Sequence, residues 1–79
     1  MTFFDEGRIY FIDSEVLDSD DADVMISDDG IYYVENNAKV MLSENERYEV
    51  LQKVEFEMEK IGLIAVMPEK YKKWRDLLK

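Results

Sequence analysis

The side chains that could do chemistry in this sequence are carboxylates, and most of them lie in one stretch. Residues 13–29 hold eight acidic side chains and neither Lys nor Arg. They are Asp13, Glu15, Asp18, Asp20, Asp21, Asp23, Asp28 and Asp29. Clustered carboxylates can bind a divalent cation, act as general acid and base, or bind the basic surface of another protein.

Calcium binding is poorly matched by the spacing of these acids. Asp18 and Asp20 resemble the first ligands of an EF-hand loop. The fifth position is then Ala22, Asp23 stands where the loop needs Gly, and Asp29 stands where it needs a bidentate Glu. The sequence therefore predicts no EF-hand and no cofactor, and it leaves open only an adventitious divalent cation.

Catalysis is disfavoured by the residue types that the chain lacks. It has no His, the commonest general base, and no Cys, which excludes a thiol nucleophile, a disulfide and a thiolate zinc site. A catalytic pair of carboxylates would need burial to separate their pKa values, and 79 residues leave little room for a substrate cleft. We expect no enzymatic activity.

The acidity is confined to the first half of the chain. Residues 1–38 carry eleven acids against Arg8 alone, a net charge of −10, whereas residues 39–79 carry eight acids and nine bases, a net of +1. An extended chain spaces the charges of residues 13–29 by ~7 Å, and folding it into a hairpin halves this to ~3.5 Å. A single DNA strand carries one charge per ~3.4 Å. The stretch therefore predicts a nucleic-acid mimic that occupies a basic, nucleic-acid-binding groove on a partner protein. The alternative is a solvated acidic loop that maintains solubility.

In size, acidity and the absence of His and Cys, the chain resembles small proteins of phages and mobile elements that disable restriction enzymes, CRISPR effectors or DNA glycosylases. This resemblance rests on composition and implies an inhibitor. The bases Lys70, Lys72, Lys73 and Arg75 lie in a protein of net charge −9, whose field opposes direct binding of nucleic acid. The sequence has no apolar run of about 18 residues and no basic leader, so we expect a cytoplasmic protein without membrane contact.

One long helix is predicted to support the acidic half of the chain. Ser43 and Glu46 form a capping box at the start of the segment 43–61, and Gly62 suits the left-handed position after its end. The apolar stripe of this helix consists of Leu51, Val54, Met58 and Ile61, flanked by Tyr48 and Val50.

Strands are predicted over residues 8–13, 23–27, 31–35 and 38–42 before this helix, and over 63–67 after it. Residues 1–6 are predicted to pack loosely against the sheet or to fray, and residues 14–22 to form a loop, with one helical turn as the alternative. Asp29-Gly30 predicts a hairpin turn between the second and third strands, and Asn36-Asn37 predicts another. If the strand 63–67 joins the same sheet as 38–42, the helix between them is a right-handed crossover and the two strands are parallel.

These elements predict a single α+β domain over residues 1–79. It has a small, mostly antiparallel sheet in the order β-β-β-β-α-β-α, covered by the long helix and by a short C-terminal helix that follows Pro68. Tyr71, Trp74 and Leu78 share one face of the last helix, and we expect this face to join the core.

Phe56 lies nearly opposite the apolar stripe of the long helix. Cover by the last helix, contact with a partner or a second copy, and simple exposure all remain open for it. The alternative function is therefore a small regulatory or interaction module that binds a protein through apolar surface around Phe56 and the last helix. In that case the acidity serves only solubility, and a homodimer is possible.

Overall fold

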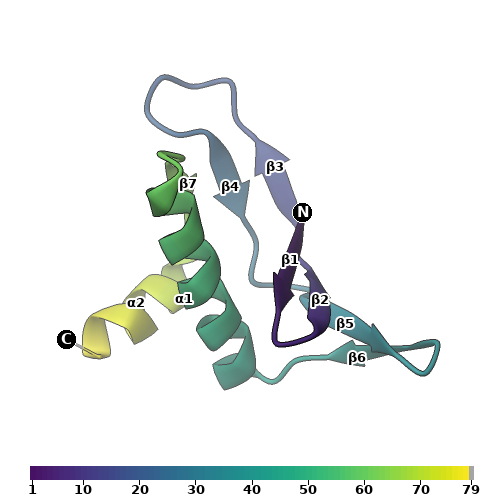
Figure 1. Ribbon diagram of the computed structural model, residues 1–79. Helices are drawn as coiled ribbons and strands as arrows, with labels where there is room; N and C mark the ends of the chain where they lie inside the picture. The colour runs from purple at the N-terminus through teal and green to yellow at the C-terminus, as the bar shows by residue number, and fades with distance from the viewer. Residues whose placement is uncertain (79) are drawn as a thin grey trace.

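The computed structural model describes residues 1–78, and six strands precede the long helix (Figure 1). The strands are β1 (Thr2–Asp5), β2 (Arg8–Phe11), β3 (Ser14–Val16), β4 (Val24–Ile26), β5 (Tyr32–Glu35) and β6 (Ala38–Met41). They are followed by α1 (Glu44–Lys60), β7 (Ala65–Val66) and α2 (Glu69–Leu77). The α+β class is confirmed, with strands first, then the long helix, one strand and a short C-terminal helix.

The strands form two small sheets. The four-stranded sheet has the order β1-β2-β5-β6 and is antiparallel throughout. The three-stranded sheet has the order β3-β4-β7, in which β3 runs antiparallel to β4 and β7 runs parallel to it.

Strands form in two segments that were expected to be irregular, so that expectation was wrong for Thr2–Asp5 and for Ser14–Val16, whereas residues 17–22 are a loop as expected. β1 pairs with β2 through a tight turn in which Glu6 and Gly7 both have positive φ, 49° and 80°. β3 pairs with β4, yet Val16 within it is 87% exposed. Backbone pairing rather than burial holds β3, and for this reason its hydrophobic pattern does not mark it as a strand.

The hairpin expected at Asp29-Gly30 does not form, because β4 and β5 belong to different sheets. Gly30 has a positive φ of 75°, but Asp29 does not share it, and a type I′ turn requires both. The connecting residues 27–31 instead cross between the two sheets, and the fully buried Ile31 anchors the crossing. The turn at Asn36-Asn37 is confirmed, with φ values of 52° and 62° between β5 and β6.

The parallel pair also differs from the one expected. β7 pairs with β4, through Val24 with Ala65 and Met25 with Val66, and not with the strand that enters the long helix. The predicted strand at 63–67 is shortened to two residues because the end of α1 uses the backbone before it. There the N–H of Leu63 donates to the carbonyl of Met58 (2.9 Å).

Helix α1 is capped at both ends much as its sequence indicates. The Ser43 hydroxyl accepts the Glu46 N–H (3.4 Å) and donates to the Glu46 carboxylate (2.8 Å), so Glu46 bonds the hydroxyl rather than the backbone of Ser43. At the other end Gly62 has φ 79°, and its N–H donates to the Glu59 carbonyl (3.2 Å). Together with the bond from Leu63, this is a Schellman motif.

The apolar stripe of α1 faces the core, as predicted, except at its end. Tyr48, Val50, Leu51, Val54 and Met58 are buried, whereas Ile61 is 71% exposed because it lies just past the last turn. The core joins these side chains to both sheets, through Tyr10, Tyr33, Ile26 and Met67 among others. A salt bridge of 2.6 Å from Lys53 to Asp5 fastens α1 to β1.

Helix α2 contributes less to the core than its sequence suggests. Tyr71 is fully buried and Trp74 packs at the edge of the core, but Leu78 is 59% exposed. Neither α1 nor α2, within the described part of the chain, has the length and apolar character that crossing a membrane requires.

Candidate functional site

The acidic stretch folds into a single hairpin, which we call the acidic hairpin and define as residues 13–29. It consists of β3, β4 and the loop 17–23 between them. At its base the Ser27 N–H donates to the Asp13 carbonyl, and near its tip the Leu17 N–H donates to the Asp23 carbonyl, both at 2.9 Å. Its loop projects at the top of the view in Figure 1, beyond the C-terminal end of α1. Six of the eight predicted acids therefore lie on one two-stranded projection, and Asp28 and Asp29 lie at its base, in the connection to β5.

The tip of the acidic hairpin is a set of solvent-exposed carboxylates. Asp18, Asp20 and Asp21 are exposed, and the loop is held by a hydrogen bond from the Asp21 backbone N–H to the Ser19 side-chain hydroxyl (3.1 Å). Glu15 is exposed on β3 and lies opposite Met25. Among residues 1–78, no cation forms an ion pair with any of the eight carboxylates, so their charge is not neutralised within this part of the protein.

Asp23 differs from the other acids because its carboxylate serves the fold. Its Oδ2 accepts the N–H of Ile64 at 2.8 Å, and its own N–H donates to the Ile64 carbonyl at 2.8 Å. These two bonds attach the acidic hairpin to the chain just before β7. Asp23 is therefore a structural residue first, and its carboxylate is only partly free for a partner.

The remaining acids, Asp13, Asp28 and Asp29, lie at the base of the acidic hairpin. Asp28 is half-buried near the start of α1, where Tyr48 has a raised pKa because of burial, a hydrogen bond to Glu44 and, more weakly, the charge of Asp28. A hollow of about 350 Å³ opens beside this base, and it is lined by Asp13, Ser14, Glu15, Met25, Ile26, Ser27, Asp28 and Pro68. In the described residues, no three acidic side chains come together in a way that could hold a metal ion.

Phe56 is apart from the acidic hairpin. Its ring is 57% exposed on α1, with the Lys60 ammonium 4.5 Å from the ring centroid. The hollow beside it is lined by Gln52, Glu55, Glu59 and Arg75, and none of these belongs to the acidic hairpin. Of the three possibilities that the sequence left open, cover by the last helix is wrong.

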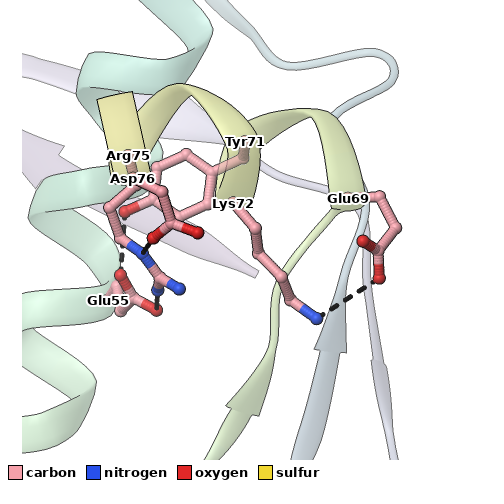
Figure 2. Close-up of polar contacts among 6 residues, drawn as sticks. All are labelled: Glu55, Glu69, Tyr71, Lys72, Arg75 and Asp76. Atoms are coloured by element: carbon pink, nitrogen blue, oxygen red, sulfur yellow. Dashed lines mark hydrogen bonds and ion pairs between the residues drawn. The ribbon is translucent and has the colours of Figure 1, made fainter. Parts of the chain in front are cut away.

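Helix α2 instead binds α1 through Glu55 (Figure 2). The Glu55 carboxylate accepts hydrogen bonds from the Tyr71 hydroxyl (2.8 Å) and from the Arg75 guanidinium (2.5 Å). Burial, followed by the hydrogen bond to Glu55, raises the pKa of Tyr71 well above its ordinary value. Lys72 pairs with Glu69 within α2 (3.4 Å). Two of the four bases in the last helix, Lys72 and Arg75, thus form ion pairs with acids of the same chain.

The structure reveals a second surface that the sequence did not indicate. The four-stranded sheet has an uncovered side, which we call the outer face. Its residues alternate with the core residues Tyr10 and Tyr33 and share cross-strand pairs with one another: Thr2, Phe4, Ile9, Phe11, Tyr32, Val34, Lys39 and Met41. Apolar residues at both alternating positions of these strands are the signal that could have predicted it.

The outer face is well exposed for so apolar a surface. Phe4 is 69% exposed, Ile9 51%, Val34 54% and Met41 56%. At its centre the rings of Phe11 and Tyr32 stack, with centroids 5.0 Å apart and an angle of 13° between the planes. The largest apolar patch on a protein surface is often functional.

No protein-family model, curated protein or solved structure matches this chain. The acidic hairpin and the outer face are therefore the two features from which its function can be inferred.

Proposed function

We propose that the protein is an inhibitor that places its acidic hairpin in the basic, nucleic-acid-binding groove of a partner protein. The observation that carries this proposal is the gathering of eight carboxylates, with no paired cation among the described residues, on one two-stranded projection and the connection at its base. Folding the stretch back on itself brings the charge spacing to ~3.5 Å along the hairpin, close to the ~3.4 Å of a DNA strand.

The seven carboxylates other than Asp23 make the surface that competes with phosphates. Asp18, Asp20 and Asp21 lead at the tip, because an exposed projection enters a groove first. A concentrated charge also speeds diffusional encounter with a surface of opposite charge. The reaction is binding alone, with no bond made or broken.

The test uses three immobilised proteins: the wild type, Asp20→Lys with Asp21→Lys, and the matched control Glu57→Lys with Glu59→Lys on α1. Each variant changes the net charge by the same amount. Nuclease-treated cell extract is passed over them, and bound protein is eluted with stepped salt or with a DNA or RNA oligonucleotide. We expect a protein that is retained by the wild type and by the α1 control, lost from the hairpin variant, and displaced by nucleic acid.

The opposite result would be equal retention on both variants, with binding unchanged between roughly 50 and 300 mM salt. The acidic hairpin would then serve solubility only.

That result would favour a second candidate function, an interaction module that binds a protein through apolar surface. The exposed Phe56 and the apolar outer face supply surface of this kind. Binding of that type changes little with salt, so the same experiment separates the two candidates.

A further inference from the structure

The outer face differs from the rest of this acidic protein in carrying no carboxylate. Its eight residues include one charge, Lys39, whose ammonium lies 4.3 Å from the centroid of the Tyr32 ring. The acids within the same four strands, Asp5 and Glu35, alternate to the other side of the sheet, and Asp5 is paired there with Lys53. A second copy could therefore approach this face without placing carboxylates of the four strands opposite one another.

The tip of the acidic hairpin is remote from the outer face, whereas the base acids Asp13 and Asp29 line a hollow together with Thr2, Phe11 and Tyr32 of that face. In Figure 1 the hairpin loop lies at the top of the molecule, whereas the turn between β5 and β6 lies at the lower right. Repulsion between solvent-exposed charges fades over a Debye length of ~8–10 Å near physiological salt. Two copies in contact through the outer face would keep their hairpin tips apart and free.

The exposed area suits a small symmetric interface. A free aromatic side chain presents roughly 150–250 Å², and at 25 cal/mol/Å² an aliphatic one corresponds to roughly 60–120 Å². Six of the eight side chains of the outer face are apolar or aromatic, and weighted by exposure they present on the order of 300–500 Å². They are Phe4, Ile9, Phe11, Tyr32, Val34 and Met41. A standard interface buries ~800 Å² on each partner, of which about 65% is apolar in homodimers. The outer face thus supplies most of the apolar part of such an interface.

The outer face has both a hollow and an exposed ring, Phe4, that could occupy the same hollow on a second copy. β2 and β5 are paired at only two positions, and where they diverge a hollow of about 390 Å³ opens between the strands. It is lined by Ile9, Phe11 and Val34 of the outer face, by Gly7, and by Arg8, Tyr33 and Glu35, which alternate to the other side of the sheet. Phe4, on the neighbouring strand, is the most exposed aromatic ring of the face. A two-fold axis in the plane between two such faces can set each Phe4 opposite its partner's hollow.

We propose that the outer face binds a second copy of this chain, so that two four-stranded sheets pack face to face as a two-fold dimer. Packed sheets of this kind lie ~10 Å apart. The edge strands β1 and β6 are four residues long, and β6 carries Lys39, so edge-to-edge pairing is less favoured. This proposal is independent of what the acidic hairpin binds.

Sedimentation equilibrium tests it on the full chain, whose monomer mass is 9.4 kDa. We expect the wild type to approach twice that mass as concentration rises, and Phe4→Glu to raise the dimer Kd by at least about 30-fold, as for an aromatic anchor that enters a hollow on its partner. The matched control is Phe56→Glu, on an aromatic side chain of similar exposure outside the face, and it should leave the Kd unchanged. Added salt should strengthen the dimer by screening repulsion, whereas it weakens docking of the acidic hairpin.

A second measurement needs no substitution and guards against a misfolded variant. Amide shifts of the wild type, followed by NMR on dilution, should change in residues 2–11 and 32–41 but not on the solvent face of α1. A monomer mass at about 0.5 mM, or equal weakening by Phe56→Glu, would overturn the proposal. Sheet amides that shift only when another protein is added would assign the face to a different partner and overturn it as well.

Discussion

At the scale of single residues, the bond between Tyr71 and Glu55 joins the two helices and governs how stability responds to alkali. Burial and the Glu55 carboxylate both oppose ionisation of the phenol, so the pKa of Tyr71 is raised in the folded protein. The hydrogen bond to Asp5 likewise raises the pKa of Lys53. In each case the folded protein holds its proton more tightly than the unfolded chain does.

The raised pKa values of Tyr71 and Lys53 predict how stability changes with pH. Because both pKa values are raised, their contribution to stability is complete below the unfolded values near ~10 and is lost as the pH rises through the folded ones. We expect the free energy of unfolding in urea to be steady from about pH 7 to 9 and to fall above about pH 10. Tyr71→Phe should cost ~1–3 kcal/mol at pH 7 by removing a hydrogen bond to a carboxylate, and should make the alkaline fall shallower.

Tyr32→Phe, on the outer face, is the matched control for this prediction. An alkaline fall of the same depth in both variants would mean that Tyr71 does not control the response to pH.

Asp23 has a structural role that its sequence context, shared with seven other acids, does not indicate. Its carboxylate accepts a backbone N–H from Ile64, a residue far along the chain. Composition and spacing report where charges lie in the sequence, but they do not reveal which carboxylate meets an unpaired N–H after folding. The acidic residues of the hairpin were thus predictable as a set. Which of them stabilises the fold and which are free to bind a partner was not.

At the scale of elements, the parts of the fold that depend on local chemistry were predictable. The start of α1 at Ser43, its end at Gly62 and the turn at Asn36-Asn37 are each determined within a few neighbouring residues. The choice of partner strands was not, because β4 pairs with β3 and β7 although Asp29-Gly30 favours a hairpin with β5. Burial of Ile31 outweighs that local preference, and burial depends on the whole fold.

The element-scale prediction concerns the ends of α1. Ser43→Ala should destabilise the protein by ~0.5–2 kcal/mol through loss of the N-cap. Gly62→Ala should cost ~1–2 kcal/mol, because a Cβ is strained at φ 79°, although it would meet no neighbouring atom. Thermal unfolding followed by circular dichroism measures both effects. Gln52→Ala, at an exposed position of α1, serves as the control and should change the stability little. If Gly62→Ala costs no more than this control, the Schellman motif is not a source of stability.

At the scale of the whole molecule, the unneutralised acidic hairpin carries a cost in stability. Two unit charges ~7 Å apart repel by ~0.6 kcal/mol in water before screening. The net charge is −9, and no ion pair within residues 1–78 relieves the acidic hairpin. Natural proteins often retain such costs where function requires the charge.

The whole-molecule prediction follows from this repulsion. Raising NaCl from about 10 to 300 mM should increase the free energy of unfolding by roughly 1 kcal/mol, because the Debye length shortens from ~30 Å to below 8 Å. Asp20→Lys with Asp21→Lys should be more stable than the wild type at low salt and should respond less to added salt. Urea titrations at the two salt concentrations provide the measurement. A wild-type protein that loses stability with salt would show that favourable ion pairs, such as Lys53 with Asp5, outweigh the repulsion.

The pairing of β7 with β4 has a consequence for the order in which the chain folds. The hairpins β1–β2 and β5–β6 close over two-residue turns, whereas the bond from Ile64 to Asp23 spans 41 residues. Closing so long a loop costs conformational entropy before the contact compensates for it. We therefore expect the local hairpins and α1 to be formed in the transition state, and β7 to dock late. A substitution that weakens the contact between β7 and β4 would then speed unfolding while leaving the refolding rate nearly unchanged.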